Sequence, residues 1–341
     1  MVNTIEQKNI NNTENLVLHK LESNPDKWIS GGDLARQAKV SRNTIWRTVR
    51  KLQNAGYSIQ SVTGRGYRLL HEQDRLSEAG INLKLNNPST YQIEVFDTID
   101  STNNILKTKA RENAVSGTLI VANAQKNGRG RRGRDFFSPP GTGVYFSLLL
   151  RPNQDYNLNQ KSPALAAVAL AKAIDKITGK TTGIKWVNDI YLNDKKIAGI
   201  LTEAELDFET RTISYMVIGV GVNIYQPQND FPEQIANTAT AIYSSAEKRS
   251  GLRNSIIAEF LNQWEIYAKR KHSEQALNIF REKSVLTNKT VDIWYNNNLL
   301  QAKVLNVNEE FELIIELEDG STKTINHGEA TLHQEGSLPN K

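Results

Sequence analysis

The sequence predicts an α+β protein built from three units, and three patterns along the chain support this prediction. Its 341 residues, 38% of them hydrophobic, are enough for two or three ordinary cores. Helical patterns and a hairpin fill the basic first seventy residues, and strand-like runs then alternate with helical patterns. From about residue 286, apolar and polar residues alternate along short strands. We therefore expect a basic N-terminal module, a central mixed sheet with helices on one face, and a small antiparallel C-terminal barrel.

The N-terminal module is predicted from "SGGDLARQAKVSRNTIWRTVRKLQNAGYSIQSVTGRGYRLL". Ser30 and Ser41 are each suited to cap a helix, and Ile45, Val49 and Leu52 place one face of the second helix in a core. "YSIQSVTGRGYRLL" then reads as a strand, a Gly-Arg-Gly turn and a strand. The arrangement resembles the winged helix-turn-helix of bacterial transcription regulators. A small helical bundle with a solvated charged face is the alternative.

Charge is concentrated in this module. Residues 15–70 contain ten Lys or Arg against three Asp or Glu, a net charge of +7, whereas residues 71–341 sum to −1. Outward Arg and Asn side chains can bond bidentately to guanine and adenine edges, and a wing arginine can reach a phosphate. Trp46 either contacts DNA or packs under the wing. The residues expected to contact DNA are Ser41, Arg42, Asn43, Thr44, Trp46, Arg47, Arg50 and Arg65.

The central unit is predicted from six strand-like runs and three helices. "SPALAAVALAKAIDKITG" is a buried helix with Ser162 as cap and Pro163 in the first helical position. "WVNDIYLNDKKIAGILT" is a hairpin that turns at Asn193-Asp194, and two more helices are expected between Ser250 and about Lys283. The strand-like runs are "YQIEVFDTI", "GTLIVANAQ", "GVYFSLLLRP", "GIKWVNDIYL", "KKIAGILTEAEL" and "TISYMVIGVGVNI".

The stretch "GRGRRGR", residues 128–134, contains four arginines and three glycines. Two like charges about 6 Å apart repel by roughly 0.7 kcal/mol in water and by roughly 2.8 kcal/mol at an effective dielectric near 20. We therefore expect this loop to be mobile until an anion arrives. Glycine N–H groups can approach a phosphate or carboxylate closely. A solvated basic loop, or a non-specific nucleic-acid patch, is the alternative.

Several classes of function are excluded by composition. The chain has no cysteine, which rules out disulfides, thiol catalysis and thiolate metal sites. Its five histidines show no metal spacing and are expected at the surface. The N-terminus, "MVNTIEQKNINNTEN", has no basic start followed by an apolar run, and no stretch resembles a membrane span, so we expect a cytoplasmic protein that does not bind membranes.

Five motifs occur in the order and spacing of biotin protein ligases: "DSTN" at 100–103, "GRGRRGR" at 128–134, "KWVND" at 185–189, "KKIAGIL" at 195–201 and "IGVGVNI" at 218–224. With its N-terminal module the chain resembles the bifunctional form, the biotin operon repressors. The resemblance implies four segments: a polar leader (1–14), a winged helix-turn-helix domain (15–72), a class II synthetase-like catalytic domain (85–285) and an SH3-like domain (286–335).

The resemblance also implies the reaction and its partners. In that family the carboxylate of biotin attacks the α-phosphate of ATP, with Mg²⁺, to give biotinyl-5′-adenylate. A lysine of the biotin carboxyl carrier protein of acetyl-CoA carboxylase, or of another biotin-dependent carboxylase, then accepts the biotin. We expect the adenylate-bound chain to form a homodimer that binds operator DNA. A ligand-sensing repressor without ligase activity and a lipoyl ligase relative are the alternatives.

Site residues are carried over from the matching motifs. Arg131 and Lys196 are expected to be catalytic, and Asp189 is the candidate ligand for Mg²⁺. The residues expected to bind biotin are Ser101, Thr102, Asn103, Gln125, Arg129, Gly130, Arg131, Lys196 and Gly199. The residues expected to bind ATP or the adenylate are Arg131, Arg134, Phe136, Lys185, Asn188, Asp189 and Asn223.

Each of these residues also has a purely structural interpretation. Ser101 to Asn103 can be an ordinary helix cap, Gly199 a bulge, Asp189 a salt-bridge partner and Asn223 a turn residue. Phe136 stands where the resemblance calls for Trp, which should weaken but retain stacking on adenine. Val187 replaces a usual Pro and leaves the backbone before Asn188 less constrained.

Overall fold

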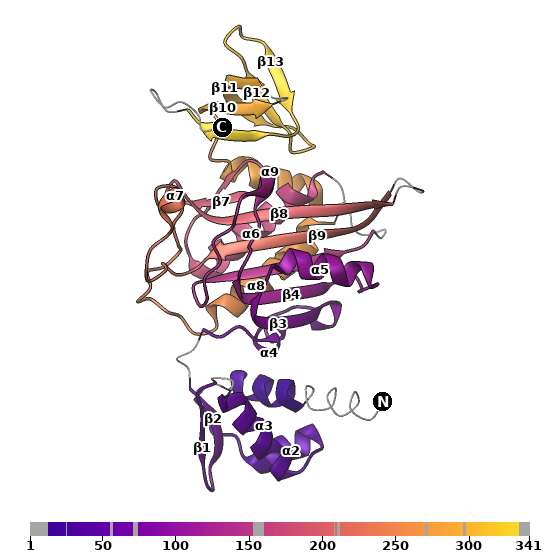
Figure 1. The fold of residues 1–341 in the computed structure, drawn as a ribbon, viewed down its shortest axis with the longest axis vertical. Helices are drawn as coiled ribbons and strands as arrows, with labels where there is room; N and C mark the ends of the chain where they lie inside the picture. The colour runs from indigo at the N-terminus through magenta and orange to yellow at the C-terminus, as the bar shows by residue number, and fades with distance from the viewer. Residues whose placement is uncertain are drawn as a thin grey trace.

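The computed structural model describes residues 13–24, 26–54, 57–70, 74–152, 160–207, 209, 212–269, 272–295 and 298–333. Three bodies follow one another along the long axis of the molecule, with the N-terminal helices at one end and a small C-terminal sheet at the other (Figure 1). The predicted polar leader lies outside the described residues up to residue 12. Within the described residues, none of the helices combines the length and apolarity that a bilayer crossing needs.

The N-terminal module has the predicted helix pair and wing. Ser30 Oγ accepts from the backbone N–H of Asp33 at 3.0 Å, and Ser41 Oγ accepts from the N–H of Thr44 at 3.0 Å, so both caps are confirmed. A further helix, residues 13–22, was not predicted, and its apolar residues complete the core of the module. The elements are α2 (Gly31–Ala38), α3 (Arg42–Asn54), β1 (Ile59–Val62) and β2 (Gly66–Leu69).

The central unit is a seven-stranded sheet in the order β3-β4-β5-β9-β8-β7-β6. Only β3 and β4 run parallel, and the other neighbours are antiparallel, so the predicted mixed sheet is confirmed. Its strands are β3 (Gln92–Ile99), β4 (Thr118–Gln125), β5 (Gly143–Leu150), β6 (Gly183–Lys185), β7 (Asp189–Leu192), β8 (Lys195–Asp207) and β9 (Thr212–Asn223).

Helices cover both faces of this sheet, so the prediction of helices on one face is wrong. One face packs against α6 (Ser162–Thr178), α8 (Leu252–Tyr267) and α9 (Ser273–Lys283). On the other face, Leu106 and Ala110 of α5 (Thr102–Arg111) pack against Ile120 and Ala122 of β4. Every residue of β5 is buried, as expected of a strand covered on both sides.

Two local predictions also need correction. The run at 183–192 is two strands, because Trp186 to Asn188 leave the sheet between β6 and β7. Helix α6 begins at Ser162, one residue earlier than predicted, with Lys161 in the cap position. Pro163 still lies in the first turn. Backbone N–H groups in that turn have no intrahelical acceptor, so proline costs no hydrogen bond there. The hairpin turn at Asn193-Asp194 is confirmed.

The C-terminal unit is a five-stranded antiparallel sheet in the order β13-β12-β11-β10-β14. Among the described residues no pairing of β13 with β14 closes it, so the predicted barrel is not found. It shares a core with the central unit: Phe280 of α9 meets Phe311 edge-on at 5.4 Å, and Trp186 Nε1 donates to the Phe311 carbonyl at 2.8 Å. The strands are β10 (Thr290–Tyr295), β11 (Asn298–Val307), β12 (Leu313–Glu316), β13 (Thr322–Ile325) and β14 (Glu329–Leu332).

The N-terminal module contacts the central unit through a short helix, α4 (Glu78–Asn82). Asn15 Nδ2 donates to Glu78 at 2.7 Å, and Ser77 Oγ donates to Glu22 at 3.0 Å. Ala79 of α4 belongs to the apolar core of the module. Burial raises the pKa of Glu22 to about 7, against the hydrogen bond from Ser77 and the charge of Lys84. The acid therefore favours its protonated form at this contact.

Glu22 should make stability depend on pH. Its pKa is about 7 in the fold and near 4.5 when unfolded, so its stabilising contribution is complete below pH 4.5 and is lost as pH rises through 7. We expect Glu22→Gln to have a higher melting temperature than the wild type at pH 8 and an equal one near pH 4.5. Glu14→Gln, on the same helix with Lys51 as partner, is the control. Equal melting curves for Glu22→Gln and wild type at pH 8 would contradict the assignment.

Candidate active site

The candidate site lies on the face of the sheet that carries α5, and three glycines form its floor. Gly199 lies in β8, and Gly219 and Gly221 lie in β9. A Cβ at Gly221 would lie 2.5 Å from the Phe136 ring, and one at Gly219 would overlap the Asn103 amide. The alternating glycines of "IGVGVNI" therefore keep the strands bare where other side chains must lie against them.

Gly199 serves the same purpose for a lysine. A Cβ there would lie 3.3 Å from Lys196 Nζ, so the glycine makes room for this side chain to lie along the sheet. Gly199 pairs regularly with Asp189 on one side and Gly221 on the other. The bulge lies nearby, where the register shifts between Ile190 and Tyr191, so the interpretation of Gly199 as a bulge is wrong.

Ser101, Thr102 and Asn103 are buried at the start of α5, and Gln125 lies beside them as predicted. Gln125 Oε1 accepts from the Thr102 N–H at 2.8 Å and is 3.1 Å from the Thr102 hydroxyl. Ser101 occupies the cap position but makes no capping hydrogen bond with its side chain. The residues therefore do not act as an ordinary helix cap.

A polar cluster below these residues was not predicted. Ser147, fully buried in β5, donates to Thr102 Oγ1 at 2.7 Å. Asn103 Nδ2 donates to Glu203 of β8 at 2.8 Å, and Lys107 pairs with the same carboxylate at 2.8 Å. Burial alone would raise the pKa of Glu203, but the hydrogen bonds from Lys107 and Asn103 lower it. A lone serine inside the apolar run "VYFSLLL" was the available signal.

The arginine-rich loop, residues 128–136, is closed by its own backbone. The Gly130 N–H donates to the Arg134 carbonyl at 2.7 Å, and the Phe136 N–H donates to the Gly128 carbonyl at 2.8 Å. Arg132 and Gly133 adopt left-handed conformations, with φ of 56° and 72°, at the tip. Gly133 takes that conformation without a Cβ penalty.

Glu329 of β14 supplies the anion that this loop requires. Arg134 makes two hydrogen bonds to the Glu329 carboxylate, at 2.6 and 3.0 Å, and Arg132 lies 3.5 Å from it. Burial alone would raise the pKa of Glu329, but Arg134 lowers it, so the carboxylate stays ionised. The C-terminal unit therefore provides one anion for the loop, a partner that the sequence did not indicate.

The other two arginines have neutral partners. Arg131 donates to the Asn188 side-chain oxygen at 2.9 Å and to the Gly328 carbonyl at 3.3 Å. Arg129, which is exposed, donates to Asn104 of α5 at 3.1 Å. Neither makes an ion pair with a carboxylate among the described residues, although the charge of Arg129 helps to lower the pKa of Asp100 and of Glu203. These two guanidinium groups are therefore the ones best suited to an incoming anion.

Three more charged residues lie on β6, β7 and β8 beside this loop. Lys196 Nζ is 2.7 Å from Asp189 Oδ1, which supports the salt-bridge interpretation of Asp189. Burial lowers the pKa of Lys185, against the charges of Asp189 and Glu329. No group of three His, Asp or Glu that could hold a metal is found among the described residues. A single carboxylate surrounded by cations does not form a protein-held Mg²⁺ site.

Asn188, Asn223 and Phe136 frame the same region. Asn188 Nδ2 donates to the Ile200 carbonyl at 2.7 Å, which fixes the connection that contains Val187 and its cis peptide bond to Trp186. Asn223 ends β9, and its amide donates to the Thr240 carbonyl at 3.2 Å. Phe136 is half-buried and meets Tyr145 edge-on at 6.3 Å.

The residues expected to contact DNA lie together on the outward side of α3 and at the tip of the wing. Arg42, Asn43 and Arg47 are exposed, as is Arg65 between β1 and β2. Trp46 is 50% exposed and has the Arg50 guanidinium 5.7 Å from its ring centre, so it does not pack under the wing. Ser41 caps α3, and Thr44 lies in its first turn.

The Glu329 contact predicts how the loop responds to trypsin, which cleaves after its arginines. An exposed pair contributes at most about 1 kcal/mol, so Glu329→Gln should speed cleavage within residues 129–134 by up to about fivefold. Glu318→Gln, an exposed glutamate of the same unit, is the control and should leave the rate unchanged. Identical cleavage rates for Glu329→Gln and wild type would show that Glu329 does not hold the loop.

Comparisons with known proteins agree with this arrangement. One family model, described as the biotin/lipoate A/B protein ligase family, matches residues 95–223, and a second, described as an HTH domain, matches residues 13–68. The bifunctional ligase/repressor BirA of Bacillus subtilis is 34% identical over 305 residues, which cover 87% of this chain and 92% of that protein. The protein of the same name from Escherichia coli is 34% identical over 57% of this chain and 59% of its own length.

A solved structure extends the comparison to three dimensions. The biotin protein ligase from Aquifex aeolicus in complex with biotin and ATP aligns with a TM-score of 0.58 and 27% identity. The alignment covers 99% of that protein but 72% of this chain, so the rest of this chain has no counterpart there. This chain therefore belongs to the family of bifunctional biotin ligases and repressors, in which a ligase domain follows a helix-turn-helix domain.

Proposed function

We propose that this protein converts biotin and ATP to biotinyl-5′-adenylate and pyrophosphate, transfers the biotin to a lysine of a carrier protein with release of AMP, and represses transcription when the adenylate stays bound. The observation that carries the ligase proposal is the gathering of Arg129, Arg131 and Lys196 around a glycine-floored surface. Attack of a carboxylate on a phosphate brings two anions together, so preorganised cations are the main requirement.

Each part of the site has a role in this proposal. Thr102 and Gln125 present fixed polar groups to the ureido ring of biotin, with Ser101, Asn103 and Gly199 shaping the pocket. Arg129 and Lys196 receive the biotin carboxylate, with Gly130 lining the site beside them, and Arg131 reaches the α-phosphate. The residues proposed to hold the nucleotide are Arg134, Phe136, Lys185, Asn188, Asp189 and Asn223.

Mg²⁺ enters this proposal with its substrate. Because this part of the site offers one carboxylate among several cations, Mg²⁺ would be held mainly by the phosphates of ATP, and Asp189 is the side chain that could contact it. That contact requires Lys196 to leave Asp189 for the biotin carboxylate. Binding of both substrates would therefore release Lys196 for the biotin carboxylate and Asp189 for Mg²⁺.

The domain boundaries are part of the proposal. Residues 15–72 read operator DNA, residues 85–285 carry the chemistry, and residues 286–335, an SH3-like module in our proposal, hold the arginine-rich loop through Glu329. The acceptor is the biotin carboxyl carrier protein of acetyl-CoA carboxylase or of another biotin-dependent carboxylase. When the acceptor is scarce, the adenylate persists and a homodimer binds a two-fold operator.

Two rival functions can be distinguished from this one. A ligand-sensing repressor without ligase activity would show no biotin-dependent exchange between ATP and pyrophosphate. A lipoyl ligase relative would prefer lipoate in a competition between the two acids. The name of the matching family model covers both biotin and lipoate, so this competition is the direct test.

The central catalytic prediction concerns Arg131. Loss of one donor to a developing charge typically costs about 10²- to 10³-fold in rate, so Arg131→Ala should lower adenylate formation by that factor. Arg132→Ala removes the same charge from the same loop and should cost less than about tenfold, because the one ion pair that Arg132 makes among the described residues is the long one to Glu329. Equal activities of Arg131→Ala and wild type would refute the assignment.

The DNA-reading prediction concerns Arg47, which is exposed on α3. A base-reading arginine contributes about 1–3 kcal/mol, so Arg47→Ala should weaken operator binding about tenfold or more while exchange of ATP and pyrophosphate is unchanged. Arg36→Ala, on α2 with Asp33 as partner, is the control. Binding should also depend steeply on protein concentration; a shallow dependence would contradict the dimer.

A further inference from the structure

A buried ion pair joins the linker of the DNA-reading module to helix α8. Asp74 is the first described residue after the wing, and Arg253 lies in the first turn of α8. Their side chains are 3% and 7% exposed, with Nε 3.5 Å from Oδ2. The Arg253 N–H donates to Asp74 Oδ1 at 2.9 Å, and its guanidinium also donates to the Asp74 carbonyl.

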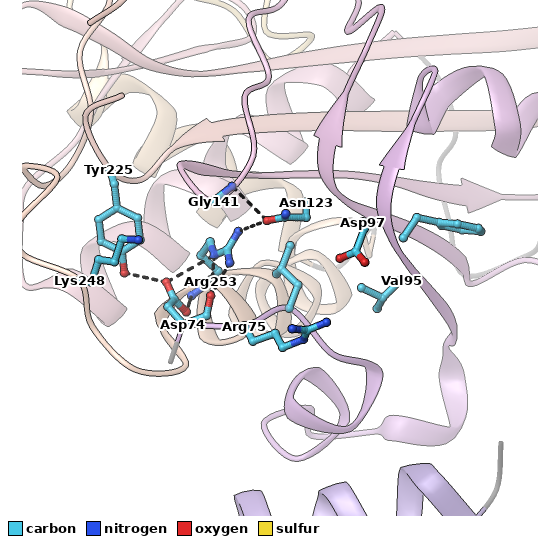
Figure 2. Close-up of a pocket in the computed structure, with 11 residues that line it drawn as sticks. Asp74, Arg75, Val95, Asp97, Asn123, Gly141, Tyr225, Lys248 and Arg253 are labelled. Carbon is cyan, nitrogen blue, oxygen red and sulfur yellow. Dashed lines mark hydrogen bonds and ion pairs between the residues drawn. The ribbon is translucent and has the colours of Figure 1, made fainter. Parts of the chain in front are cut away.

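The same arginine reaches the catalytic sheet. Its Nη1 donates to Asn123 of β4 at 2.8 Å and to the Gly143 carbonyl of β5 at 3.3 Å, and Asn123 also accepts from the Gly141 N–H at 3.1 Å. The Tyr225 hydroxyl donates to Asp74 at 2.6 Å. Figure 2 shows these groups converging beside a cavity of about 450 Å³.

Every segment that the pair touches continues into the proposed ligand site. Asn123 lies two residues before Gln125 in β4, and Tyr225 lies two residues after Asn223. Gly141 follows the loop that contains Phe136. Three separate parts of the site are therefore connected to this ion pair: Asn123 directly through Arg253, Gly141 through Asn123, and Tyr225 through Asp74.

The linker side is tied equally firmly to the DNA-reading module. Asn254, next to Arg253, accepts from the Ser77 N–H at 3.1 Å and donates to the Arg75 carbonyl at 2.8 Å. Ser77 then donates to Glu22 of the module, and the Arg75 guanidinium lies 4.5 Å from the ring centre of Tyr57. Linker, module and catalytic sheet therefore form one continuous set of contacts.

We propose that the Asp74–Arg253 pair is a latch that couples occupation of the ligand site to the placement of the DNA-reading module. The proposal rests on the ligase and repressor functions above and adds the residues that link them. A buried charge left without its partner is strongly destabilising, so breaking the pair releases the linker from α8 rather than weakening it slightly. Asp74 and Arg253 are positioning residues, since neither contacts the proposed substrates.

The test compares two substitutions that line the same cavity. Asp74→Asn breaks the pair, whereas Asp97→Asn removes an exposed carboxylate that has no hydrogen bond or ion pair among the described residues. The probe is a duplex that the wild-type chain selects from a random library with biotin and MgATP. The readout is the ratio of duplex affinities with and without biotin and MgATP.

We expect Asp74→Asn to lower this ratio about tenfold or more and Asp97→Asn to keep the wild-type ratio. A wild-type ratio for Asp74→Asn overturns the latch. If Asp74→Asn does not fold, Tyr225→Phe decides, because it removes the hydroxyl that donates to Asp74 and also accepts from the Arg249 N–H. A lowered ratio supports the latch, and an unchanged one overturns it.

Hydrogen exchange separates failure of the latch from failure of the proposed function. In the full chain without added ligand, Asp74→Asn should speed amide exchange in residues 13–22 and 74–82, and Asp97→Asn should not. If the wild type selects no duplex, the repressor function fails and the latch is judged on exchange alone. Unchanged exchange in Asp74→Asn then overturns it.

Discussion

The structure depends on one electrostatic constraint, the need to compensate four guanidinium groups that lie within seven residues. One of them, Arg134, is hydrogen-bonded to the Glu329 carboxylate, while the side-chain hydrogen bonds of Arg129 and Arg131 among the described residues go to neutral oxygens. The ion pair with Glu329 fixes the loop, and the remaining guanidinium groups can still bind an anion. The C-terminal unit thereby takes part in the site, because Glu329 and the Gly328 carbonyl both belong to it.

The second constraint is space. Side chains must lie against one face of a sheet that is otherwise covered on both sides, and strand positions without side chains leave room for them. Lys196 lies against Gly199, and Asn103 lies against Gly219. Phe136 lies against Gly221 in the same way. The glycines therefore determine where side chains can lie against the sheet, and the nearby arginines and Lys196 favour anionic ligands.

Much of this could be predicted from the sequence, because local signals were strong. Caps at Ser30 and Ser41, the wing and the Asn193-Asp194 turn depend on short-range chemistry and were correct. What failed depends on tertiary contacts: α5 covers the second face of the sheet because Leu106 and Ala110 are buried against β4, and Glu329 lies 195 residues from Arg134. No local sequence pattern predicts an ion-pair partner so far away along the chain. Closure of the C-terminal sheet could not be predicted for the same reason, since alternation indicates strands but not how they pair.

Two functions in one chain require that the ligand site and the DNA-reading module influence each other, and the contacts around Asp74 and Ser77 provide a continuous physical route. The account as a whole still depends on the arginine-rich loop. The most direct measurement is a crystal structure of the chain with biotin and MgATP. The account predicts guanidinium nitrogens of Arg129 or Arg131 within about 3.2 Å of the biotin carboxylate or the α-phosphate. Both groups pointing into bulk solvent, away from the ligand, would contradict it.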